Sequence, residues 1–143
     1  MNSSALPAQP TSVTYRFVVP RATTAPKIVR EFVATLLAAF GHEDIVEHLK
    51  LCVSEVVTNA YQHTRTAQIT VDVSLGSDSV TVWVADGRPG WLPRVPRSAP
   101  PWHDESGRGL YLVSRFADEL GVGAADDDGA PRLGFTIGYK GAA

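Results

Sequence analysis

The order of elements along the chain predicts an α+β fold, a two-layer α/β sandwich in which helices cover one face of a mixed, mostly antiparallel sheet. Three observations indicate this fold. Two amphipathic helices follow each other within residues 26–63, an alternating hairpin spans residues 67–85, and a short helix precedes two strands within residues 109–139. Strands joined by short turns pair as antiparallel neighbours, and the helices between them supply the covering layer.

The composition is that of one compact domain. The chain has 143 residues, of which 44% are hydrophobic, and a net charge of -2, so it can bury roughly two-thirds of its unfolded surface. This charge argues against a protein that binds nucleic acid directly through phosphate contacts. No membrane helix or signal peptide is apparent, so we expect a cytoplasmic location without membrane attachment. A single cysteine, Cys52, excludes an internal disulfide and predicts a small core residue.

The N-terminal part of the chain divides into an arm, a strand and a helix. Residues 1–12 are polar with two prolines and predict a flexible arm, so the domain proper spans residues 13–143. Residues 13–19 (VTYRFVV) are β-branched and aromatic and predict a strand. A helix is then expected from Pro26 to Phe40. Its predicted buried face consists of Ile28, Val29, Phe32, Val33, Leu36, Leu37 and Phe40.

A second helix is expected from about residue 42 to His63, and it carries the first functional signal. One stripe is apolar throughout and consists of Ile45, Leu49, Val53, Val56 and Ala60. The opposite stripe becomes polar toward the C-terminal end and includes Glu55 and Asn59, which leave the same face one turn apart. Carboxylate and amide oxygens suit Mg²⁺ when phosphates and water complete its shell. Taken alone, this pair is better explained by an ordinary solvated helix face.

The C-terminal half contains the hairpin, a long loop and the last three elements. Residues 67–75 and 80–84 alternate around a turn at residues 76–78 and predict two paired strands. Residues 87–107 hold five of the ten prolines and two of the three tryptophans, a composition that predicts an irregular lid over a site. A helix at residues 109–117 and strands at 119–122 and 133–139 follow.

Two further motifs indicate a ligand. Asp86 follows an apolar strand, where a carboxylate can accept a hydrogen bond from an exocyclic amine, although Asp-Gly is also a common turn pair. The segment SGRGL (residues 106–110) precedes a helix, so its backbone N–H groups and the helix dipole favour an anion. The alternative for this segment is a hinge capped by Ser106.

Together these motifs resemble a known family. LCVSEVVTNAYQHT (residues 51–64) resembles the N-box of the Bergerat-fold (histidine kinase-like) ATPases, and VADGRPG (84–90) and SGRGL (106–110) resemble their two glycine boxes. Within that superfamily the likeness is closest to the anti-sigma-factor serine kinases of bacterial sporulation and stress control. It covers about residues 13–139 and implies a Bergerat-type ATP-binding fold.

The resemblance also implies roles for individual residues. Glu55 would be the catalytic general base that takes a proton from a serine hydroxyl or water, and Asn59 would bind Mg²⁺ beside the ATP phosphates. Asp86 would recognise the adenine amino group, and the backbone amides of residues 107–109 would surround the phosphates. The implied cofactor-binding set is Asn59, Asp86, Gly90, Gly107, Arg108, Gly109 and Leu110.

Three functions remain open at this level. The resemblance implies a homodimeric anti-sigma factor that binds a sigma factor and phosphorylates a serine of an antagonist protein. A non-catalytic module that docks a regulatory partner is the alternative, because Arg88 stands where the first box usually has its central glycine. A partner-dependent ATPase or a split histidine-kinase component ranks third, since we find no phosphoacceptor helix in the sequence.

Overall fold

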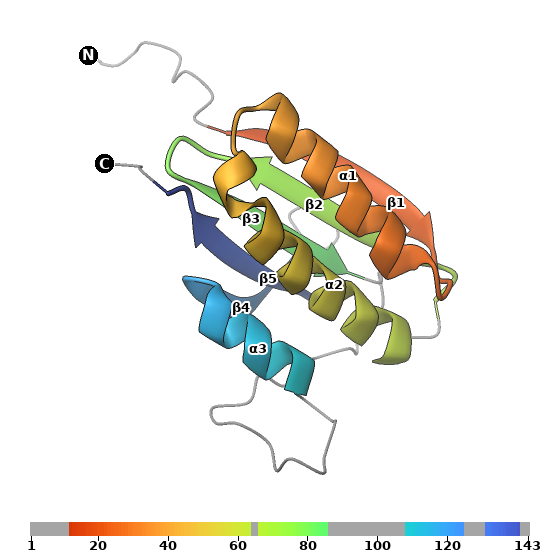
Figure 1. Cartoon of the computed structure of the whole chain (residues 1–143). Coiled ribbons are helices and arrows are strands. Elements are labelled where there is room, and N and C mark those ends of the chain that lie inside the picture. Colours follow the sequence, from red (N-terminus) through yellow and green to blue (C-terminus); the bar gives the residue numbers. More distant parts are fainter. Residues whose placement is uncertain (1–11, 64–65, 86–107, 125–130, 141–143) are drawn as a thin grey trace, which may run out of the picture.

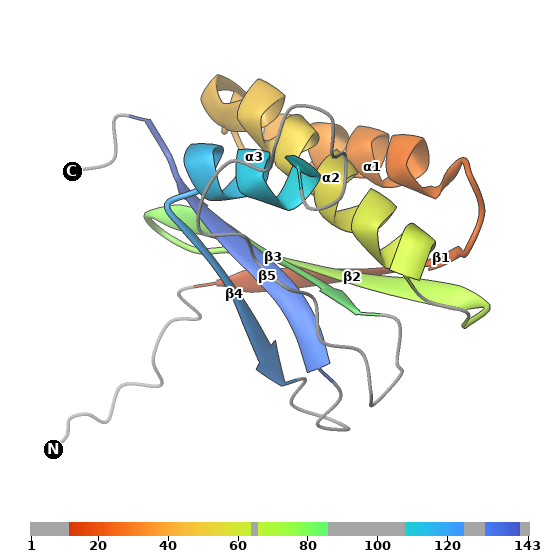
Figure 2. The same ribbon diagram turned by 90° about the horizontal axis from the view of Figure 1, so that it is seen from below.

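The computed structural model describes residues 12–63, 66–85, 108–124 and 131–140. Its strands are β1 (Val13–Pro20), β2 (Gln68–Leu75), β3 (Ser79–Ala85), β4 (Glu119–Ala124) and β5 (Pro131–Gly138). Its helices are α1 (Ala25–Ala39), α2 (Val46–His63) and α3 (Arg108–Phe116), with a 3₁₀ turn at Glu43–Ile45 before α2. The helices lie on one face of the sheet (Figures 1 and 2). The predicted two-layer α+β fold is confirmed.

The sheet is antiparallel in every described pairing, in the order β1-β2-β3-β5-β4, so the expected mixed character is wrong. The connections explain this. Two helices that run in opposite directions separate β1 from β2, so the chain reverses three times between these strands, and an odd number of reversals makes β2 antiparallel to β1. Strands β3 and β4 do run in the same direction, because each is antiparallel to β5. Since β5 lies between them, they form no parallel ladder.

The two long helices begin and end where local chemistry dictates. Pro26 occupies the first turn of α1, where its missing N–H costs nothing. Gly41 adopts a positive φ of 78° immediately after this helix, a conformation that only glycine adopts without strain. The N–H of His42 then donates to the carbonyl of Leu37 at 2.8 Å. The predicted second helix therefore begins as a 3₁₀ turn and becomes α-helical at Val46.

The core lies between the helices and the sheet. The predicted apolar stripe is buried, and none of its five members, Ile45 in the 3₁₀ turn and four residues of α2, is more than 1% exposed. On the sheet side, alternate residues of β2, β3 and β5 point toward the helices and are buried. They include Ile69, Val71, Val82, Leu133 and Phe135. This core fixes α2 over the centre of the sheet (Figure 2).

The predicted buried face of α1 is only half correct. Val29, Val33, Leu36 and Leu37 are buried, whereas Ile28, Phe32 and Phe40 are 43%, 48% and 41% exposed. The reason is the position of α1 beside β1, which is the edge strand of the described sheet, so that no further described strand covers that side of the helix. Phe32 instead stacks on the ring of Phe17, at 4.9 Å between centroids.

Candidate functional site

The site is built on α2, whose position is fixed by contacts at two points. The guanidinium of Arg30 on α1 donates to Ser54 Oγ at 2.8 Å, one residue before Glu55. Nearer the C-terminal end, Arg21 Nε donates to the carbonyl oxygen of Tyr61 at 3.0 Å, and its guanidinium lies 4.7 Å from the Tyr61 ring centroid. A cation beside the last carbonyls of a helix also complements the helix dipole. These contacts hold Glu55 and Asn59 in place relative to α1.

Glu55 lies against the first turn of α3. A Cβ atom built on Gly109 would lie 2.6 Å from Glu55 Oε1 and 3.5 Å from Glu55 Cβ. Any side chain at position 109 would therefore displace the carboxylate. The first N–H groups of a helix have no partner within it, and those of α3 begin at Arg108 and Gly109. The structure thus brings a carboxylate from α2 and the N-terminal turn of α3 together.

Asn59 lies one turn further along α2, and its side chain has an unsatisfied group. Its Oδ1 atom is buried and has no hydrogen-bond partner among the described residues. Most buried polar atoms in native proteins are paired, so an isolated amide oxygen indicates a ligand that completes it. A hard oxygen donor of this kind suits Mg²⁺.

The electrostatic environment distinguishes Glu55 from an ordinary surface glutamate. Burial raises the pKa of its carboxyl above the usual value, which makes the carboxylate a stronger base. The pKa of Cys52 is raised to about 12, first by burial and then by the charge of Glu55. Cys52 is fully buried, in agreement with its expected role as a core residue.

The remaining predicted site residues divide into two groups. Asp86, Gly90 and Gly107, together with Arg88 and the expected lid, lie outside the described residues. Arg108 is the first residue of α3, and Leu110 in the same turn is 2% exposed. The Leu110 side chain therefore belongs to the core, which leaves only its backbone N–H for a ligand.

The residues that position the site have little signal in the sequence. Arg21 and Arg30 were not singled out, because a contact between an arginine and a helix some 24 or 40 residues away has no periodic signal. Ser54 precedes Glu55 in the motif itself, and this adjacency was the one available indication of its role.

The chain is similar to proteins of one family. Residues 18–130 match the histidine kinase-like ATPase domain. The chain is 30% identical over 109 residues to a serine-protein kinase RsbW of Bacillus licheniformis, an alignment that covers 66% of this chain and 68% of that protein. It is 28% identical over 96 residues to a protein of the same name from Oceanobacillus iheyensis, covering 58% and 60% respectively. No helix within the described ranges has the length and apolar character needed to cross a bilayer.

Proposed function

The chain belongs to the histidine kinase-like ATPase domain family, and on that premise we propose that it is a cytoplasmic anti-sigma factor with serine/threonine kinase activity. Its substrate would be a serine of an anti-sigma-factor antagonist. One observation carries this proposal: Glu55 lies against the N-terminal turn of α3, one helical turn from the unsatisfied Oδ1 of Asn59. The two relatives named as serine-protein kinases support it.

The described residues fit ATP and Mg²⁺, which when bound would supply the transferable phosphoryl group and neutralise its charge. Asn59 Oδ1 would bind the ion, which satisfies a buried acceptor that has no partner in the part of the chain that the structure describes. The first N–H groups of α3 would donate to phosphate oxygens. The residues before α3, including Gly107, and the adenine-recognising Asp86 would complete the nucleotide site.

Glu55 would take the proton from the attacking serine hydroxyl. The Glu55 carboxylate, on α2, lies against the first turn of α3 and so beside the groups that would hold the phosphates. The raised pKa of Glu55 brings its basicity closer to the working pH, which is the condition for efficient general base catalysis. The protein otherwise positions the reactants and spreads charge from the phosphates, since the phosphoryl transfer itself needs little covalent help.

The test is transfer from ATP labelled at its γ-phosphate to a purified antagonist protein, with a variant of that protein whose acceptor serine is alanine as control. Labelling of the serine-bearing protein alone would support the kinase. If ATP bound without any transfer, the kinase assignment would be wrong. If ATP did not bind at all, the non-catalytic docking module suggested by Arg88 would replace it.

Gly109→Ala is expected to lower phosphotransfer by about a hundredfold without unfolding the protein. The new Cβ atom would push the flexible end of Glu55 away from its position, while the helix itself gains from alanine in place of glycine. Phosphotransfer rate and melting temperature should be measured on the same preparations. The assignment of Glu55 would lose support if Gly109→Ala transferred phosphate at the original rate.

We also propose that the protein is a homodimer, which forms through the exposed apolar patch of Tyr15, Ile28, Phe32 and Phe40 beside the free edge of β1. Phe32→Glu would place a charge in this patch and should raise the dimer dissociation constant by at least about tenfold. Sedimentation equilibrium would measure it. Val18→Glu, an exposed position on the opposite face of β1, is the matched control. Equal association by both variants would move the interface elsewhere.

A further inference from the structure

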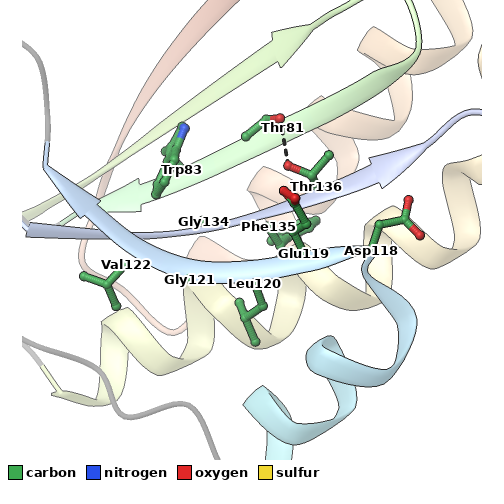
Figure 3. A pocket seen from close by; sticks show the side chains of 10 residues that line it. All are labelled: Thr81, Trp83, Asp118, Glu119, Leu120, Gly121, Val122, Gly134, Phe135 and Thr136. Carbon is green, nitrogen blue, oxygen red and sulfur yellow. Dashed lines mark hydrogen bonds between the residues drawn. The ribbon is translucent and has the colours of Figure 1, made fainter.

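The face of the sheet opposite the helices contains a groove of about 570 Å³ that the proposed kinase site does not use (Figure 3). It lies over β3, β5 and β4. Its lining combines threonines, an indole, glycines and acidic side chains, among them Thr81, Trp83, Glu119, Gly121, Gly134 and Thr136. The side chains on this face come from residues that alternate with the buried ones of the same strands.

Two rows of residues cross these strands and shape the groove. The first row is formed by Thr81, Thr136 and Glu119, in which the two threonine hydroxyls are 3.0 Å apart. The second row is formed by Trp83, Gly134 and Gly121. The Trp83 indole leans over Gly134, where a Cβ atom would lie 2.6 Å from its Cδ2 atom. A Cβ atom on Gly121 would meet nothing within 4 Å, so the hollow lies directly over this glycine.

The charge of the groove is negative. Asp118 and Glu119 lie at one end, and neither forms an ion pair in the described part of the chain. Asp118 Oδ2 accepts a hydrogen bond from the N–H of Gly138 at 2.6 Å. The basic residue nearest to Trp83, Arg132, does not line the groove. Its guanidinium lies 4.4 Å from the indole centroid and 3.5 Å from Asp72, a carboxylate that it shares with Arg16.

The groove adjoins an edge strand. Strand β4 ends the sheet order and has no neighbour on its outer side among the described strands. Alternate backbone N–H and C=O groups of such a strand are therefore available to an added strand. The sequence of β4, ELGVGA, has no lysine or proline of the kind that blocks edge pairing. Its two glycines allow another backbone to approach closely.

We propose that β4 and this groove bind an extended, basic segment of a protein partner. The segment would add a strand along β4 and place a lysine or arginine side chain over Gly121, between the Trp83 indole and the Glu119 carboxylate. The acidic lining complements that charge, and the indole can pack against the aliphatic stem of the incoming side chain. The site lies on the sheet face opposite α2, so its occupation does not depend on the proposed nucleotide site.

The test uses the full chain and a fluorescein-labelled peptide that alternates lysine with threonine and valine, with anisotropy as the readout. We expect saturable binding that is weakened at least about tenfold by Glu119→Arg. Gly121→Leu should have the same effect because it fills a hollow that the fold leaves empty. Glu31→Arg, the same charge change at an exposed position on α1, should bind the peptide as the original protein does.

Three outcomes would overturn the proposal: no saturable binding of the lysine peptide, equal binding of a peptide with glutamate in place of lysine, or equal binding by Glu119→Arg and Glu31→Arg. Amide shift changes upon peptide addition should concentrate at Gly121 and Gly134 and at the Trp83 indole. Changes confined to the helical layer would contradict this location.

ATP titrations of the same variants separate this test from that of the kinase, because the groove variants should retain their nucleotide affinity.

Discussion

Replacing Glu55 by glutamine is expected to lower the phosphotransfer rate by about 10²- to 10⁴-fold while ATP affinity is retained. Glutamine has nearly the same shape and can still face Gly109, but it cannot accept the hydroxyl proton. Single-turnover transfer and calorimetric ATP titration should be measured in parallel. Glu31→Gln on the exposed face of α1 is the matched control and should leave both values unchanged. Transfer at the original rate by Glu55→Gln would refute the general base role.

The same substitution should raise the melting temperature at neutral pH. Burial raises the pKa of Glu55 in the folded protein, so the native state holds this proton more tightly than the unfolded state does. The stability of the original protein therefore falls as pH rises from the unfolded pKa through the raised folded pKa. Glu55→Gln removes that loss of stability, and the difference in melting temperature between the variant and the original protein should disappear in acid. Activity follows the opposite course, because protonation of Glu55 at low pH removes the base.

Asn59→Ala is expected to weaken ATP binding in the presence of Mg²⁺ by at least about a hundredfold, and to remove most of the difference between titrations with and without the ion. The physical reason is the loss of the one buried oxygen that we assign to the metal. The stability of the nucleotide-free protein should not fall, because the amide oxygen that is removed has no partner within the described ranges.

Asn59→Asp is the informative companion, since it retains an oxygen ligand and should keep part of the Mg²⁺ dependence. Calorimetry measures the affinities, and thermal unfolding without nucleotide measures the stability. If Asn59→Ala bound ATP with unchanged Mg²⁺ dependence, the unsatisfied Oδ1 would require another explanation. A large loss of stability in the nucleotide-free protein would indicate a structural role instead.

Much of the fold was predictable because its signals are local. Period-two alternation identified β2 and β3, and the apolar stripe of α2 predicted its buried face correctly. The face of α1 was predicted too broadly, because periodicity reports which residues share a side and not how much of that side a neighbour covers. Phe32 and Phe40 share the side of Val33 but contact the rings of the edge strand β1, Phe17 and Tyr15, and stay exposed. The fully antiparallel character of the sheet has no local signal either, because it depends on the insertion of β5 between β3 and β4.

The candidate site was predictable to the extent that it resides in motifs. The spacing of Glu55 and Asn59 placed both on one helix face, and the glycine before the third helix indicated an anion site. The close approach of Gly109 to Glu55 joins residues from different helices, so no single motif reported it. The groove had no sequence signal at all, since it arises from the cross-strand alignment of Trp83 with two glycines.

The insertion of β5 between β3 and β4 has a consequence for how the chain folds. The central ladder of the sheet joins residues such as Thr81 and Thr136, which are 55 positions apart, with α3 and β4 in the intervening loop. Closing so long a loop costs entropy before its contacts form, which favours slow folding. During synthesis, β1, β2 and both long helices emerge first, and the outer side of β3 waits unpaired until β5 leaves the ribosome. During that interval β3 is an exposed edge strand that can pair with a wrong partner. A chaperone that covers this incomplete sheet of β1, β2 and β3 would therefore prevent aggregation.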